Sequence, residues 1–171
     1  MLTLRPDWRG APPRPAAGLN VAARAGVDLN PIDTGDAAQT RRLLAYLWPD
    51  QPHRLALTRA AIAARPPLPD RADAIDWLAG RLDPRPGRLH LIWTTVAWHY
   101  FAPASQRRGT ALIEAAGAQA TPDAPIAWLA HEADGAGPGA GLTLRLWPGD
   151  LRLDLGRADF HGRWIDWRTP R

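Results

Sequence analysis

The longest nearly unbroken apolar run in the chain is Arg88–Phe101, RLHLIWTTVAWHYF. The run is rich in β-branched and aromatic residues, and the Pro- and Gly-containing stretch Pro84–Gly87 precedes it. Such a run is typical of a strand that is buried on both faces, in the middle of a parallel sheet covered by helices. We therefore expect this segment to be the central strand of the fold.

Apolar residues at spacings of three and four predict helices before and after this strand. The expected helices begin near Asp36, Asp50, Asp73 and Pro103. Asp36 with Gln39 three positions later has the pattern of a capping box, and Asp50 is a suitable N-cap.

Other apolar segments predict further strands. Asn20–Val27 is a brief apolar segment, and Pro125–His131 has the composition of a second buried strand. Leu142–Trp147 and Leu151–Leu155 alternate apolar and polar residues around a Pro-Gly-Asp turn, which predicts a hairpin with one wet face. Buried strands that alternate with helices predict a three-layer α/β fold with a doubly wound, mixed sheet, to which the hairpin adds antiparallel edge strands.

The chain has 171 residues and no linker long enough to divide it. We expect an extended lead-in at residues 1–19 and a single α/β domain at residues 20–171. The alternative is that residues 20–171 are the C-terminal part of a longer domain.

The net charge of +4 comes from arginine alone, because the sequence contains no lysine. The arginines are spread along the chain, so we do not expect nucleic-acid binding. There is no cysteine, which excludes disulfides and thiol chemistry. No signal segment or membrane-spanning run is recognisable, and we expect a cytoplasmic protein without a membrane partner.

Polar residues follow the first predicted strand at Asp28 and Asn30. A carboxylate at the carboxyl end of a parallel strand can hold the hydroxyl groups of a ribose. The alternative is an Asp/Asn/Pro turn that leads into the next helix. Asp73 can accept a hydrogen bond from the amine of a base, or it can be an ordinary N-cap.

Two further candidates lie near the C-terminus. His131, Glu132 and Asp134 are close in sequence, but adjacent residues on a strand point to opposite faces, so we expect no metal site. Glu132 remains a candidate because it lies where the strand ends, at the edge where ligands bind in α/β sheets. His161 is a candidate general base, or a histidine that packs among aromatic neighbours.

Several segments in order resemble the bacterial family DUF2332, whose members have no assigned reaction. The segments are GVDLNPID, LLAYLWPDQPHRL, ADAIDWL, the apolar strand, HEADG and DFHGRWIDW. The resemblance covers nearly the whole chain from about residue 20. Members of this type carry a His-Ser pair at the end of the central strand, where this chain has Thr94 and Thr95.

More loosely, the chain resembles Rossmann-like methyltransferases that use S-adenosylmethionine. The resemblance implies that Asp28 holds the ribose, that Asp73 reads the adenine, and that Thr94 and Thr95 line the catalytic face. It also implies that the terminal hairpin closes the sheet.

The glycine-rich first strand and loop of that class are absent from this sequence. The central strand would then lack a partner on one side, because strand one lies beside it in that class. Either a preceding part of a longer protein, or Leu2–Leu4, or Asn20–Arg24, or another chain would have to supply the missing strand.

These observations lead to two hypotheses. The first is an incomplete or degenerate S-adenosylmethionine-dependent methyltransferase-like domain with a nucleoside-type ligand. The second is a non-catalytic binding or assembly module, in which some of the nine tryptophans form an aromatic contact surface. The tryptophans considered for that surface are Trp8, Trp48, Trp164 and Trp167. Ordinary anchoring of core and loops is the alternative role of these side chains.

Overall fold

The computed structural model describes residues 3–15, 18–64 and 67–169. The described residues form two compact units, which are presented separately. The first unit comprises the described residues of Met1–Leu4 and Leu19–Trp77, and the second those of Arg5–Gly18 and Leu78–Arg171. The prediction of a single domain from residue 20 onward stays a prediction.

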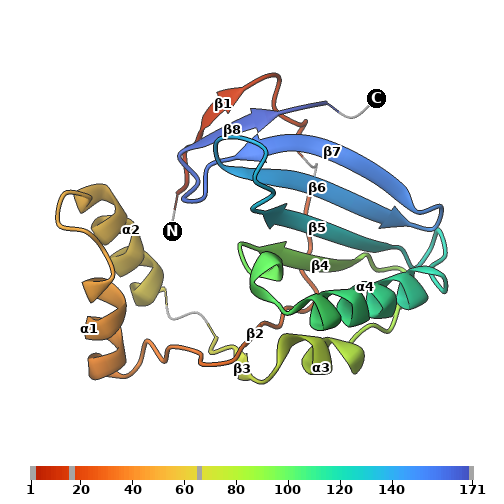
Figure 1. The fold of residues 1–171 in the computed structure, drawn as a ribbon, viewed down its shortest axis with the longest axis horizontal. Coiled ribbons are helices and arrows are strands. Elements are labelled where there is room, and N and C mark those ends of the chain that lie inside the picture. Colours follow the sequence, from red (N-terminus) through yellow and green to blue (C-terminus); the bar gives the residue numbers. More distant parts are fainter. Residues whose placement is uncertain (1–2, 16–17, 65–66, 170–171) are drawn as a thin grey trace. The chain divides into compact units, whose positions relative to one another are not determined.

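The second unit is built on one mixed β-sheet. Its strands are β1 (Asp7–Arg9), β4 (His90–Thr95), β5 (Ile126–Glu132), β6 (Ala140–Trp147), β7 (Leu151–Ala158) and β8 (Trp164–Trp167). They lie side by side in the order β1-β8-β7-β6-β5-β4 (Figure 1). The pairs β4–β5 and β1–β8 are parallel, and the other neighbours are antiparallel.

One face of this sheet is covered by α4 (Pro103–Gly117), which follows a short 3₁₀ helix, η1 (Trp98–Tyr100). The buried cluster under α4 consists of Leu78, Ile92, Ile113, Ala116, Ile126 and Trp147. It joins the helix to three neighbouring strands, β4, β5 and β6. The helix and the parallel β4–β5 pair form the unit's hydrophobic core, as the apolar spacing predicted.

The expectation that Arg88–Phe101 forms a central strand buried on both faces is wrong. Only His90–Thr95 is a strand, and it lies at the edge of the six-stranded sheet. Ile92 faces α4 and is buried, whereas Leu91 and Trp93, which point to the other face, are 50% and 66% exposed. An unbroken apolar run shows that both faces avoid charge, but it does not identify what covers each face.

The sequence left open which segment pairs with the second side of this strand. Among the described residues, β4 pairs with β5 alone. Asn20–Arg24 forms no strand, and neither does Leu4. Leu2 lies outside the described residues, so neither segment is seen to fill the gap.

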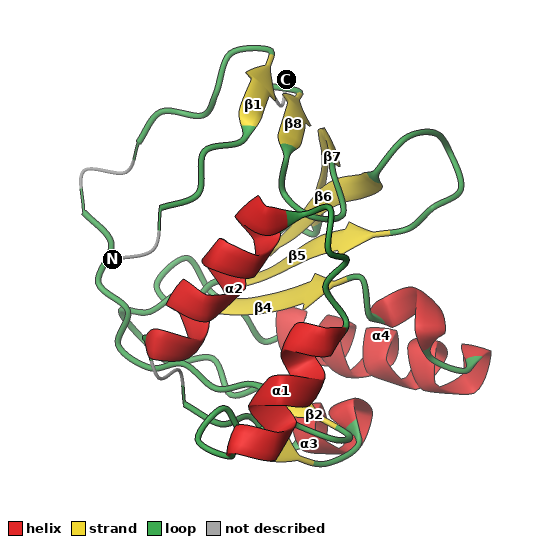
Figure 2. Cartoon of the chain, turned by 90° about the vertical axis from the view of Figure 1, so that its left-hand side faces the viewer, coloured by secondary structure: helices red, strands yellow, loops and turns green. Residues whose placement is uncertain are grey.

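The C-terminal hairpin is confirmed as β6 and β7, which pair antiparallel. It is not at the edge, because β8 and then β1 continue the sheet beyond β7 (Figure 2). Gly156 makes this possible: its φ is +107°, and an added Cβ would lie 2.0 Å from the Asp166 carbonyl oxygen. Only glycine allows β7 and β8 to approach so closely at this point.

The first unit contains two short strands and the N-terminal helices. Its elements are β2 (Val27–Asp28), α1 (Ala37–Ala45), α2 (Pro52–Ala63), β3 (Asp70–Arg71) and the start of α3 (Ala74–Ala79). Strands β2 and β3 pair parallel as a separate two-stranded sheet. The expected strand Asn20–Val27 is therefore reduced to Val27 and Asp28.

Two helix starts in this unit differ in their capping. Asp36 caps α1 as predicted, and its Oδ1 accepts hydrogen bonds from the backbone N–H groups of Ala38 and Gln39. Asp50 does not cap α2. The N-cap is Gln51, without a side-chain cap bond, and Pro52 takes the first helical position, where it needs no hydrogen-bond acceptor.

The fold is therefore α/β with a mixed six-stranded sheet. The three-layer, Rossmann-like arrangement stays a prediction. Within the described ranges, every helix is too short or too polar to cross a membrane.

Candidate functional site

The parallel pairing of β2 and β3 brings the carboxyl ends of both strands to one edge. β2 ends at Asp28, which pairs with Arg71 at the end of β3. The guanidinium of Arg71 donates a hydrogen bond to the side-chain oxygen of Asn30, over 2.9 Å. Asp73 follows two residues after β3, so three of the residues predicted from the sequence gather at this edge.

Both carboxylates at this edge also have local roles. Asp28 Oδ1 accepts a hydrogen bond from the backbone N–H of Asn30 at 2.7 Å, which forms an Asx turn. Asp73 Oδ1 accepts from the backbone N–H groups of Ile75 and Asp76, which is an N-cap of α3. The second oxygen of each carboxylate accepts no hydrogen bond from a described residue, and both side chains are exposed.

The carboxyl end of β5 carries Glu132, whose side chain is 16% exposed. Its carboxylate accepts hydrogen bonds from the backbone N–H groups of Ala97 and Trp98, at 3.0 and 3.1 Å. It also accepts from Nδ1 of His99 at 2.9 Å. Several donors thus converge on one carboxylate at the end of the β4–β5 pair.

A strained turn brings these donors to Glu132. Val96, directly after β4, has φ +48°, a left-handed conformation that a β-branched residue rarely adopts. Its N–H donates to the carbonyl of His131, which anchors the turn to β5 at 2.8 Å. Such strain costs on the order of 1–3 kcal/mol and persists only where surrounding contacts hold it.

Thr95 and His131 are opposite each other on the parallel β4–β5 pair and share one face. Nε2 of His131 lies 3.3 Å from the carbonyl oxygen of Ala158, which can only accept, so Nε2 carries the proton. In the neutral ring Nδ1 is then an acceptor, to which the Thr95 hydroxyl can donate over 3.3 Å. Thr94 points to the other face, where it accepts from the indole of Trp128.

The predicted catalytic candidates therefore do not converge on one point. Thr95 lies with His131 on one face of the sheet, and Glu132 lies with His99 on the other. Alternation along a strand accounts for this separation. Neither pairing was predicted from the sequence, because Thr95–His131 depends on strand register and Glu132–His99 on the turn at Val96.

His161 lies in the loop between β7 and β8, and its side chain is exposed. No described residue hydrogen-bonds its imidazole. Its backbone N–H donates to the buried carboxylate of Asp159, which also accepts from the guanidinium of Arg163 at 2.7 Å. Arg163, followed by the loop N–H groups, holds the pKa of Asp159 well below its usual range.

Asp134 belongs to a separate ion pair in the Gly-rich loop after β5. Arg157 donates to both of its oxygens, at 2.7 and 2.8 Å, and lowers the pKa of this carboxyl far below its ordinary value. Asp134 is thus engaged away from His131 and Glu132. Across the described residues, no three His, Asp or Glu side chains are grouped as metal ligands would be.

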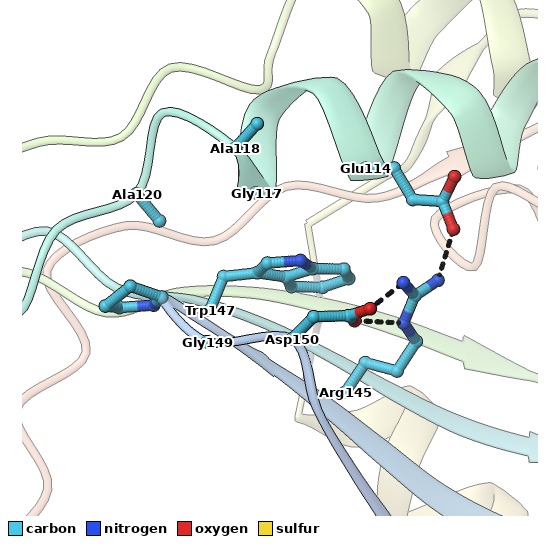
Figure 3. A pocket seen from close by; sticks show the side chains of 9 residues that line it. Glu114, Gly117, Ala118, Ala120, Arg145, Trp147, Gly149 and Asp150 are labelled. Atoms are coloured by element: carbon cyan, nitrogen blue, oxygen red, sulfur yellow. Dashed lines mark hydrogen bonds and ion pairs between the residues drawn. The ribbon is translucent and has the colours of Figure 1, made fainter.

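A groove of about 530 Å³ lies between the end of α4 and the β6–β7 turn. Figure 3 shows Arg145 between Glu114 and Asp150, with dashed lines to both, and Trp147 beneath Gly117. The Arg145 guanidinium also stacks on the Trp147 ring, 4.5 Å from its centre. These charged groups bond to one another, so their observed role is to connect α4 to the β6–β7 turn.

Comparison with known proteins identifies a family and gives no further relative. Residues 1–167 match the family described as "Uncharacterized protein conserved in bacteria (DUF2332)", so the chain belongs to this family. No curated protein and no solved structure matches the chain. The resemblance to DUF2332 is therefore confirmed, and the resemblance to methyltransferases stays a prediction.

Proposed function

We propose that this DUF2332 chain is a nucleoside-binding domain of the methyltransferase-like, Rossmann type. The observation that carries the proposal is the parallel pairing of β2 and β3, which gathers Asp28, Asn30 and Asp73 at one carboxyl edge. Ligands of α/β sheets bind beyond the carboxyl ends of parallel strands.

The residues at this edge fit the nucleoside part of S-adenosylmethionine. The second oxygen of Asp28 is available to a ribose hydroxyl, and that of Asp73 to the amine of adenine. Asn30 is held by Arg71 and offers its amide group as a further donor. When bound, the cofactor supplies a methyl group on a sulfonium centre.

The methionine part of the cofactor has no comparable match. The sequence lacks the glycine-rich strand and loop that cradle that end in the methyltransferase class. We therefore assign no methyl-transfer step to the chain. A ligand held only by its nucleoside end should bind equally well with or without the amino-acid tail.

Calorimetric titration of the full chain with adenosine and with S-adenosylhomocysteine tests this proposal. Both ligands should bind with the same affinity, within about threefold. Asp28→Asn should weaken both about tenfold or more, because a hydrogen bond to a charged group contributes about 1.5–3 kcal/mol. Asp50→Asn, a substitution in the α1–α2 connection, is the matched control and should bind as the wild type does.

Two results would contradict the proposal: no heat with either ligand at millimolar concentration, or equal affinity of the Asp28→Asn and wild-type chains. Markedly tighter binding of S-adenosylhomocysteine would contradict the narrower claim that only the nucleoside end is held.

In the part of the chain that the structure describes, one edge of β4 is unpaired, and this favours a second candidate function, self-assembly. Leu91 and Trp93 are exposed beside this edge, and no Asp, Glu or Arg interrupts the sequence from Leu89 to Ala102. Natural edge strands are usually protected by charges, and this one is not. A second copy could pair with β4 antiparallel about a two-fold axis without opposing like charges.

Light scattering over a range of concentrations tests the assembly function. A dimer that Trp93→Asp converts to a monomer supports it. A wild-type monomer at the highest concentration contradicts it.

A further inference from the structure

A carboxylate–imidazole pair at the end of β5 is arranged for proton transfer. A carboxylate can only accept hydrogen bonds, so the 2.9 Å contact between Glu132 and His99 requires the proton on Nδ1 of His99. In the neutral ring, Nε2 is then an unprotonated acceptor. No described residue donates to Nε2. The tautomer of His99 is therefore fixed with its basic nitrogen available.

The position of Glu132 is itself fixed. The backbone N–H groups of Ala97 and Trp98 hold the carboxylate in addition to His99. Its low exposure keeps water from competing for these bonds. A carboxylate that holds an imidazole in one tautomer also stabilises the imidazolium formed when the ring accepts a proton.

The surroundings of His99 indicate what kind of molecule could reach it. The imidazole is a quarter exposed, and the Tyr100 ring lies beside it with ring centres 4.0 Å apart. Tyr100 is largely exposed, so its face is available for stacking. A small molecule that approaches this exposed pair of rings meets Nε2 of His99 as a hydrogen-bond acceptor.

We infer that His99, positioned by Glu132, is a proton acceptor for a small compound with a weakly acidic hydroxyl group, such as a phenol, at the carboxyl end of the β4–β5 pair. The proton of the phenolic O–H passes to Nε2 of His99. The O–H bond breaks and an N–H bond forms, which leaves a phenolate and an imidazolium. The negative charge of Glu132 balances the imidazolium. This inference does not depend on nucleoside binding at β2 and β3.

p-Nitrophenol is a direct probe, because it turns yellow when it loses its proton. The full chain is added to p-nitrophenol at fixed pH, slightly below the pH at which the free phenol ionises, and the phenolate absorbance is recorded. The wild type should raise the phenolate fraction, and His99→Gln should abolish that increase. His53→Gln, an exposed histidine on α2, is the matched control and should behave as the wild type.

Glu132→Gln tests the positioning role. The amide oxygen of glutamine can still accept the bonds from Ala97, Trp98 and His99, but the negative charge is lost. The phenolate increase should fall severalfold although the chain stays folded. If Glu132 only braced the turn, Glu132→Gln would leave the phenolate signal unchanged, and this result would overturn the role assigned to it.

The absence of any wild-type increase, or an equal increase with His99→Gln, would overturn the inference. If His99→Gln does not fold, ¹⁵N NMR of the wild-type histidines decides instead. The neutral His99 ring should carry its proton on Nδ1, and a proton on Nε2 would overturn the inference.

Discussion

Removing the Glu132 carboxylate should open the turn at Val96, and the size of the effect follows from the contacts. Glu132→Ala removes the acceptor of the Ala97 and Trp98 N–H groups. Hydrogen bonds to a charged group contribute about 1.5–3 kcal/mol each. Because the turn is partly exposed, water can bind the freed N–H groups and reduce the loss. The same bonds offset strain of on the order of 1–3 kcal/mol at Val96. Local opening should therefore become easier by about 3 kcal/mol.

Amide hydrogen exchange measures this opening directly. Since 1.4 kcal/mol is a factor of ten, about 3 kcal/mol corresponds to exchange of the Ala97 and Trp98 amides that is ~100-fold faster. Glu114→Ala removes the only other glutamate, which lies on α4 and pairs with Arg145 of β6, and it should leave both amides unchanged. Exchange in Glu132→Ala that stays within about threefold of the wild type would refute the reasoning.

Two further predictions concern the second unit. Gly117→Ala should destabilise the chain by about 1–3 kcal/mol, because the new Cβ would lie 2.6 Å from the Trp147 indole; denaturant unfolding should show no such loss for Gly80→Ala, where the added Cβ meets nothing within 4 Å. The hydrogen bonds from Arg163 are the first cause of the low pKa of Asp159 in the folded chain. The ionised carboxylate therefore stabilises the folded chain in full above about pH 5, and this stabilisation is lost as the pH falls. The difference in Tm between wild type and Asp159→Asn should therefore be smaller at about pH 2 than at about pH 7, and an equal difference at both would contradict this assignment.

Elements whose signal is local were predictable from the sequence. The apolar spacing and caps gave α1 and α4, and the alternation around the Pro-Gly-Asp turn gave the β6–β7 pair. Helix α3 begins directly after Asp73, as expected, and it ends at Ala79.

Elements that depend on distant partners were not predictable. β8 forms because it pairs with both β7 and β1, and nothing local in Trp164–Trp167 distinguishes a strand from a loop. The same limit explains the error at β4. Leu91 and Ile92 are equally apolar, but only Ile92 meets a helix.

The candidate site residues also differ in whether the sequence near them gave a signal. The sequence suggested Glu132 and Asp28 as candidates from their places at the ends of strands, and Asp73 from its place at the start of a helix. It did not identify His99, because the residue reaches Glu132 only through the left-handed turn at Val96. A β-branched residue gives no sequence signal for that conformation.

The most direct test of the account is to map where adenosine binds. In ¹H–¹⁵N spectra of the labelled chain, increasing adenosine should shift the amides of Asp28, Asn30 and Asp73 in a saturable manner. Asp28→Asn should abolish these shifts. Saturable shifts at the β4–β5 edge, around Thr95 and Glu132, with none at β2 and β3 would contradict the central claim, as would the absence of any saturable shift.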